Sequence, residues 1–210
     1  MLSAKEFMQL LHYENSEKEM DAVHEIKRSI EQKYDVEVYK CVLKYNEQND
    51  VIYVFIYLQT NPQLKRIEQS ANEQDAANEM KAILNRHAIS CNDVLWVFFR
   101  SFELEALVDC YRSAHVDLKK FVMTQFDPTT MKMIQWPAMF VEFKTKEDLE
   151  YAEKHGDLQR IKEAYYNYVK PHDTFNLITP DKHLLIHFDY VQGVKTRRLY
   201  YDLYWKLLEN

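Results

Sequence analysis

Asp127, Glu142 and Lys144 are the residues whose types and spacing come closest to a catalytic pattern. Glu142 and Lys144 form an acid-x-lysine triplet at the end of a predicted strand, and Asp127 lies upstream at a predicted turn. Asp127 and Glu142 could hold magnesium while Lys144 stabilises charge on an attacked phosphate. Alternating charges on an edge strand explain the triplet equally well, since 29% of the residues are charged. A chain without catalytic residues is the preferred interpretation, and a magnesium-dependent nuclease is the alternative.

The histidines and cysteines do not have the spacing of a metal site or an activated nucleophile. His183 and His187 lie in a strand-like segment, where four residues separate two side chains by about 13 Å. Cys41 and Cys110 stand among apolar positions and are expected to be small buried residues, whereas Cys91 lies in a predicted loop. We therefore expect no metal and no cofactor.

Glycine is too scarce for the common phosphate-binding motifs. Gly156 and Gly193 are the only two glycines in the chain. Walker loops, dinucleotide-binding loops, kinase loops and nucleophile elbows all need clustered glycines for tight turns or close backbone approach. These enzyme classes are therefore excluded.

Tyrosine is frequent, with 15 residues, and part of it is clustered near the C-terminus. The candidate partner-binding residues of these clusters are Tyr165, Tyr166, Tyr168, Tyr200, Tyr201, Tyr204 and Trp205. Tyrosine and tryptophan combine a large rigid surface with a polar tip and are enriched at protein interfaces. The competing interpretation is that they are half-buried covers of a sheet.

The segment Val51–Leu58, VIYVFIYL, predicts the central strand of the fold. Its residues are apolar at both odd and even positions, so we expect helices to cover both of its faces. Residues 36–45 alternate in polarity and are followed by a turn, which predicts a hairpin with Val51–Leu58. The apolar residues 94–99 predict a strand of the same sheet or one packed against it.

The other predicted elements follow from helical periodicity, capping residues and turn signals. The predicted helices are residues 4–12, a helix from Ser16, 67–87, a short helix after Ser101, a helix from Thr145 to Gly156, 158–169 and 196–208. The predicted later strands are a hairpin of 121–126 with 131–136, a strand at 138–143 and a last hairpin of 175–179 with 184–190. Together they predict an α+β fold in which a mainly antiparallel sheet of hairpins is covered by amphipathic helices.

The length and composition suit one α+β domain over residues 1–210, because 47% of the residues are hydrophobic. If the chain is divided, the join is expected near residues 116–119. The formal charge of -6 argues against non-specific binding to nucleic acid. The odd cysteine count and the lack of a long apolar run predict a cytoplasmic protein that does not bind membranes. The sequence leaves the oligomeric state open.

The C-terminal segments NLITPDKHLLIHFDY and LYYDLYWKLL resemble the tails of some small bacterial cytosolic proteins, including immunity proteins that neutralise a partner toxin. The resemblance covers about the last sixth of the chain and implies a non-enzymatic protein-binding module. Acidic charge with surface tyrosines suits a basic protein partner. The alternatives are the magnesium-dependent nuclease and a regulator that binds a small ligand between sheet and helices.

Overall fold

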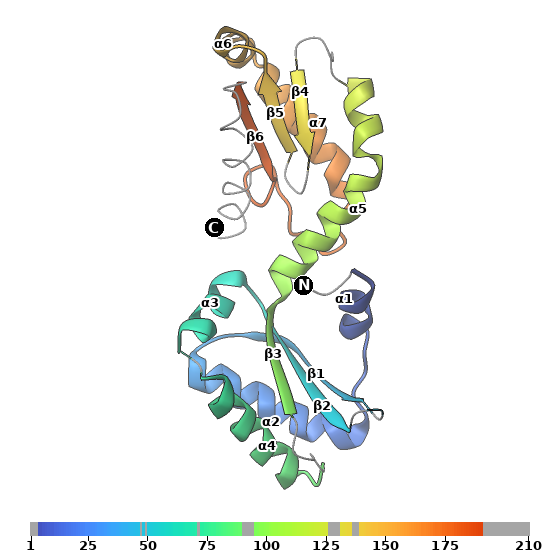
Figure 1. The fold of residues 1–210 in the computed structure, drawn as a ribbon, viewed down its shortest axis with the longest axis vertical. Coiled ribbons are helices and arrows are strands. Elements are labelled where there is room, and N and C mark those ends of the chain that lie inside the picture. Colours follow the sequence, from blue (N-terminus) through green and yellow to red (C-terminus); the bar gives the residue numbers. More distant parts are fainter. Residues whose placement is uncertain are drawn as a thin grey trace. The chain divides into compact units, whose positions relative to one another are not determined.

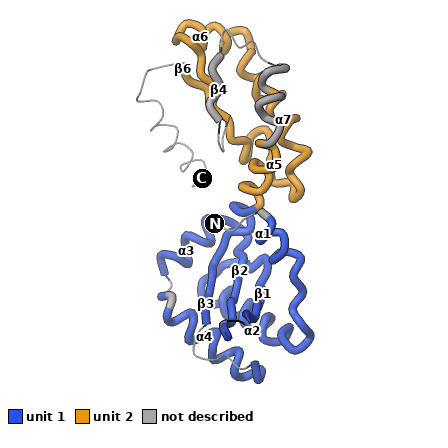
Figure 2. Tube along the Cα trace, turned by 45° about the vertical axis from the view of Figure 1, so that its right-hand side comes forward, with its two compact units in different colours: residues 1–105 blue, residues 106–210 orange. Residues whose placement is uncertain are grey.

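The computed structural model describes residues 4–46, 48, 50–70, 72–89, 95–125, 131–135 and 139–190. Helices and strands are mixed along the chain, in agreement with an α+β fold. The chain divides into two compact units, Met1–Glu105 and Ala106–Asn210 (Figure 2). The expectation that residues 1–210 form one domain stays a prediction.

The first unit is built on a three-stranded sheet (Figure 1). Its elements are α1 (Ala4–Leu11), α2 (Glu17–Tyr34), β1 (Val38–Asn46), β2 (Val51–Leu58), α3 (Asn61–Ser70), α4 (Glu73–Arg86) and β3 (Leu95–Ser101). The strand order is β1-β2-β3, so β2 is central, and β1 pairs with it antiparallel as expected. β3 pairs with β2 in parallel, because α3 and α4 carry the chain back to the start of the sheet.

One face of this sheet packs against α2 and α4. Ile52, Val54, Ile56 and Leu58 of β2 have even numbers, so they point to the same side, where they join one buried cluster. The helices contribute aliphatic residues to that cluster, namely Ala22, Val23, Ile26, Ile30, Met80, Ile83 and Leu84. This cluster is the core of the first unit.

Capping residues fix where several helices begin and end. The Glu19 carboxylate accepts a hydrogen bond from the backbone N–H of Ser16 at 2.7 Å, which orders the start of α2. In the second unit, the Thr145 hydroxyl accepts one from the Asp148 N–H at 3.1 Å. Gly156 follows α6 with φ +75°, a left-handed conformation that glycine adopts without strain.

The second unit repeats the element order of the first. It contains most of α5 (Phe102–Gln125), then β4 (Met131–Gln135), β5 (Met139–Phe143), α6 (Lys146–Lys154), α7 (Asp157–Val169) and β6 (Ile186–Tyr190). The sheet order is β4-β5-β6, with β4 antiparallel and β6 parallel to β5. From α2 onward the first unit runs helix, strand, strand, helix, helix, strand, and the second unit follows the same order of helices and strands from α5. Each sheet contains one antiparallel and one parallel strand pair.

The two later hairpins predicted from the sequence are wrong. Residues 121–125 belong to the last turns of α5, and β4 pairs with β5 instead. Residues 175–179 form no strand apart from a single bridge between Thr179 and Lys182, and β6 pairs with β5. A short apolar run such as 121–125 suits a helix as well as a strand, and its length alone does not separate the two.

The segment after α7 is held by a carboxylate network instead of a strand. Asp173 accepts hydrogen bonds from the backbone N–H groups of Leu177 and Ile178 at 2.9 and 2.8 Å, and from Lys170 Nζ at 2.9 Å. Burial raises the pKa of the Asp173 carboxyl, but donation from Ile178, Lys170 and Leu177 outweighs burial and holds the pKa below its ordinary value. The ionised carboxylate is therefore the form that the fold requires.

We predict that Asp173→Asn lowers the free energy of unfolding by about 1.5–3 kcal/mol at neutral pH, since hydrogen bonds to a charged group are lost. Because the pKa of Asp173 is lowered by folding, its stabilisation is present above the unfolded value and is lost as pH falls through the folded value. The difference between wild type and variant should therefore shrink below about pH 4. Urea unfolding at pH 7 and pH 3 measures it.

Asp181→Asn is the matched control, because Asp181 is exposed a few residues further along the same segment. It should change the free energy of unfolding by less than about 0.5 kcal/mol at either pH. A pH-independent difference between Asp173→Asn and wild type would contradict the role given to the ionised carboxylate.

Candidate functional site

The second face of the first unit's sheet carries a group of aromatic side chains. Tyr53 and Phe55 of β2 have odd numbers and point away from the core cluster. The parallel register places Trp96 opposite Tyr53 and Phe98 opposite Phe55, so these β3 side chains share their face. Four aromatic side chains from two neighbouring strands therefore lie together.

The helix α1 covers only one end of this face. Phe7 contacts Tyr57 with a ring-centroid distance of 5.9 Å, and Lys40 Nζ donates to the Leu11 carbonyl. Tyr57 and Lys40 lie opposite each other in the β1–β2 register, so α1 covers this end of the sheet. Among the described residues, no helix covers the end formed by Tyr53 and Trp96, and Trp96 is 54% exposed.

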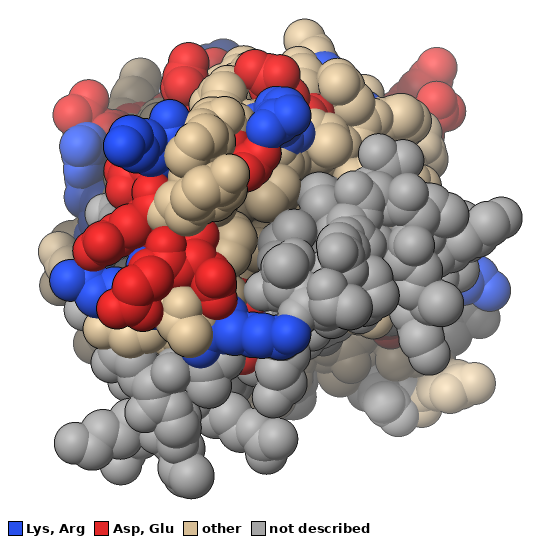
Figure 3. All heavy atoms as spheres, turned by 90° about the horizontal axis from the view of Figure 1, so that it is seen from above, with Lys and Arg blue, Asp and Glu red and all other residues tan. Residues whose placement is uncertain are grey.

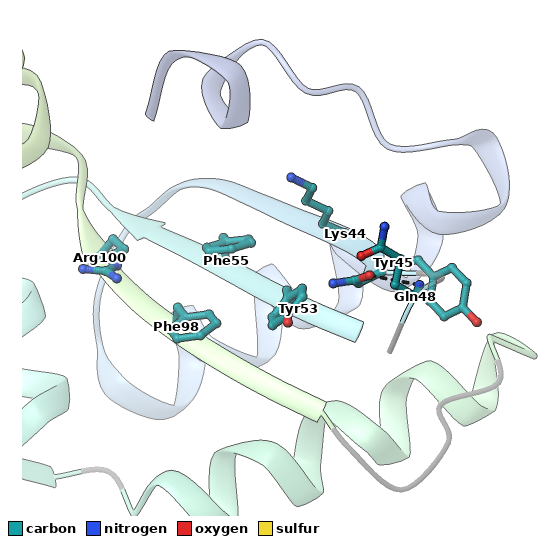
Figure 4. Close-up of a pocket in the computed structure, with 8 residues that line it drawn as sticks. Lys44, Tyr45, Gln48, Tyr53, Phe55, Phe98 and Arg100 are labelled. Carbon is teal, nitrogen blue, oxygen red and sulfur yellow. Dashed lines mark hydrogen bonds between the residues drawn. The ribbon is translucent and has the colours of Figure 1, made fainter. Parts of the chain in front are cut away.

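The aromatic rings contact one another across the strands (Figure 4). Phe55 and Phe98 have centroids 5.2 Å apart and planes within 18° of each other. Tyr53 lies 6.2 Å from Phe98, and Trp96 lies 6.5 Å from Phe98 with planes 11° apart. The four rings form a continuous aromatic surface centred on Phe98.

A groove of about 630 Å³ lies over this surface. We call it the aromatic groove, and it is lined by Lys44, Tyr45, Asn46, Gln48, Tyr53, Phe55, Phe98 and Arg100. Its two cations come from the two outer strands, with the rings of β2 between them (Figure 4). None of the described residues that line it is an aspartate or a glutamate.

Buried polar atoms without partners lie beside the Arg100 end of the groove. Arg100 Nη1 lies 3.8 Å from Glu105 Oε1, a long ion pair, and the Arg100 guanidinium lies 6.0 Å from the Phe98 ring. Arg100 Nε and the hydroxyl of Tyr57 have no hydrogen-bond partner among the described residues. Burial, followed by the Glu105 charge, raises the pKa of Tyr57. Arg100 Nε and the Tyr57 hydroxyl are both buried, so only the exposed part of the Arg100 guanidinium can reach a group bound in the groove.

The residues of the nuclease alternative are not brought together in the described part of the chain. Glu142 is buried in β5, 3% exposed, and Lys144 is exposed just beyond the end of that strand. Asp127 lies outside the described residues. No group of three or more potential metal ligands occurs in the parts of the chain that were described. The nuclease alternative stays a prediction.

The tyrosines of α7 are part of the second unit's core. Tyr165 is 2% exposed, which corrects its assignment as a partner-binding residue, because its ring has no surface to offer. Tyr166 and Tyr168 are half-buried against the same cluster. Tyr168 donates to the Ala114 carbonyl and stacks on Phe121 with centroids 4.3 Å apart. Tyr200, Tyr201, Tyr204 and Trp205 lie outside the described residues.

Two cysteines are buried and have unreactive thiols, as expected. Cys41 and Cys110 are free thiols with 4% and 3% exposure. Burial raises the pKa of each thiol to about 12, so neither forms a thiolate at neutral pH. Cys91 lies outside the described residues.

Charged side chains elsewhere are mixed rather than sorted by sign. Figure 3 shows acidic and basic side chains next to one another on the face seen from above. Ion pairs of helix spacing, such as Lys146 with Glu150 at 3.2 Å, are typical of solvated helix surfaces and contribute little stability. Such a surface gives no reason to expect a binding site there.

The sequence reasoning missed the aromatic groove because it expected both faces of Val51–Leu58 to be covered. A usable signal was present in the alternation of β2. Its even positions 52, 54, 56 and 58 are aliphatic, whereas Tyr53, Phe55 and Tyr57 at the odd positions are aromatic. Aromatic residues at alternate positions of a strand are compatible with a contact surface as well as with a core, and Tyr57 at the same parity is fully buried.

The chain matches no protein-family model, no curated protein and no solved structure. None of the helices in the described ranges is long and apolar enough to cross a membrane. The geometry of the aromatic groove therefore has to carry the functional argument by itself.

We predict that Tyr57→Phe leaves the free energy of unfolding unchanged or raises it by about 1 kcal/mol, because a buried hydroxyl without a partner is removed. Tyr111→Phe is the matched comparison. Its hydroxyl donates to the His183 carbonyl and accepts from the Leu185 N–H at 2.8 Å. Removing it should cost about 1–3 kcal/mol. Urea unfolding followed by circular dichroism compares the two, and equal losses would show that the Tyr57 hydroxyl has a partner.

Proposed function

We propose that the chain is a non-enzymatic protein-binding module whose binding surface is the aromatic groove. The observation that supports it is the group of four aromatic side chains on the part of the sheet face that α1 leaves uncovered. Exposed aromatic residues with a rigid backbone are the usual anchors of protein interfaces. An immunity-type role, suggested by the C-terminal resemblance, is the most specific form of this proposal.

The strands hold the aromatic surface in a fixed arrangement before any partner arrives. Tyr53 and Phe55 alternate along β2 with Val54, which is fully buried in the core on the other side. The register with β3 fixes the spacing of Phe55 and Phe98. A surface ordered in advance loses little conformational entropy on binding, which favours affinity.

The lining of the groove suits binding more than catalysis. Its described residues include no carboxylate, histidine or cysteine, which are the side chains most often used for acid–base and nucleophilic steps. Its polar members are amides, tyrosines and two cations, which can orient a bound surface by hydrogen bonds. The two free, buried cysteines suit a reducing compartment, and we therefore propose a cytoplasmic location.

A small organic ligand is the second candidate occupant. The groove volume of about 630 Å³ lies within the range of small-molecule sites. A ligand-binding regulator would bind such a molecule to the purified protein without any protein partner. Calorimetric titration with a panel of aromatic metabolites separates this alternative from a protein partner.

We predict that Trp96→Ala and Phe98→Ala each abolish the capture of the partner protein by the tagged full chain from a lysate of its own source. Trp96 is exposed and Phe98 is partly exposed, so these aromatic anchors would be lost while the sheet is kept, as circular dichroism should show. Tyr151→Ala is the matched control, because Tyr151 is 63% exposed on α6 and lies outside the groove. Its capture should equal that of the wild type. Equal capture by Phe98→Ala and wild type would refute the groove as the binding surface.

A further inference from the structure

The charge of the aromatic groove is opposite to that of the unit that contains it. The formal charge of -6 comes entirely from residues 1–105, because residues 106–210 contain equal numbers of basic and acidic residues. The described residues that line the groove in this acidic unit nevertheless include two cations, Lys44 and Arg100, and no carboxylate. Positive charge in the groove of a negatively charged unit favours the binding of a negatively charged group there.

We propose that the aromatic groove binds an acidic segment of a partner protein, with a carboxylate near Arg100 or Lys44 and an apolar side chain on the rings. This inference rests on the proposed function, since it assumes that the groove is the binding surface. It also reverses the expectation of a basic partner, which followed from net charge alone. The charge at the contact surface, rather than the charge of the whole chain, decides complementarity.

Both cations are able to accept a carboxylate. Lys44 is exposed, and no ion pair joins it to another described residue. Arg100 Nε is buried, but the Arg100 side chain is 27% exposed, and its Nη1 lies 3.8 Å from Glu105 Oε1, too far for a strong hydrogen bond. The ring of Phe98 lies beside the guanidinium and holds it at the edge of the groove. A carboxylate placed there would gain a charge-assisted hydrogen bond.

A protein segment fits these charges better than single-stranded nucleic acid does. Aromatic rings beside cations can also stack bases, but nucleic acid brings one phosphate per nucleotide. Its affinity depends on several lysines and arginines along the strand. Two cations in a unit of charge -6 would leave most of those phosphates facing an acidic surface. A peptide with one or two carboxylates avoids that repulsion.

The test selects short peptides from a random phage-displayed library with the full chain as bait. Selected peptides are then synthesised with a fluorescent label and titrated by anisotropy against wild type, Lys44→Glu and Phe98→Ala. Lys18→Glu is the control for charge, since Lys18 is exposed on α2 in the same unit and lies outside the groove. A labelled short oligothymidine is titrated in parallel as the nucleic-acid probe.

We expect peptides rich in aspartate or glutamate that also contain an aromatic or large aliphatic residue. Lys44→Glu should weaken their binding about tenfold or more, Phe98→Ala should abolish it, and Lys18→Glu should leave it unchanged.

Basic peptides whose binding is abolished by Phe98→Ala would overturn the acidic partner and keep the groove. Peptides that bind Phe98→Ala as well as wild type, or no selected peptides at all, would overturn both the inference and the proposed function. Tighter binding of oligothymidine than of any peptide, lost in Lys44→Glu, would replace the protein segment by nucleic acid.

Discussion

The alternation of side chains along β2 is the constraint on which the first unit depends. The aliphatic residues at its even positions must be removed from water, and burying each of them contributes about 1.5–3 kcal/mol. α2 and α4 supply the matching apolar surface, and the sheet pairing follows from it. The aromatic residues at the odd positions of the same strand then lie on the other face of the sheet at fixed spacing. The alternation of aliphatic and aromatic residues along β2 therefore underlies both the core and the aromatic groove.

The two units show that equal topology does not produce equal surfaces. From α2 in the first unit and from α5 in the second, both run helix, strand, strand, helix, helix, strand, with an antiparallel and a parallel strand pair. In the second unit all five residues of β5 are buried, including Glu142. In the first unit Tyr53 and Phe55 on the equivalent central strand stay partly exposed. The side chains, and not the arrangement of elements, decide which sheet offers a binding face.

The features that the sequence predicted are local, and the missed features are not. The pairing of β1 with β2 depends on alternation and an adjacent turn, and the starts of α2 and α6 depend on Ser16 and Thr145. Residues 121–125 are helical because α5 continues through them, and residues 175–179 form no strand because β6 pairs with β5; neither outcome is encoded in the short segment itself. The groove exists because α1 has only eight residues and covers one end of the sheet. How much of the sheet α1 covers depends on how the elements pack, and the hydrophobic periodicity of the sequence does not predict it.

The positions of Lys44 and Arg100 also explain how an open aromatic face can remain free for a partner. The three-stranded sheet has β1 and β3 as its edges, and edge strands are the usual sites of unwanted association between copies. One cation stands on each of these strands beside the rings. Two copies meeting through this face would bring like charges together, which disfavours self-association. The same charges attract a carboxylate, so one arrangement both disfavours a second copy and favours an acidic partner.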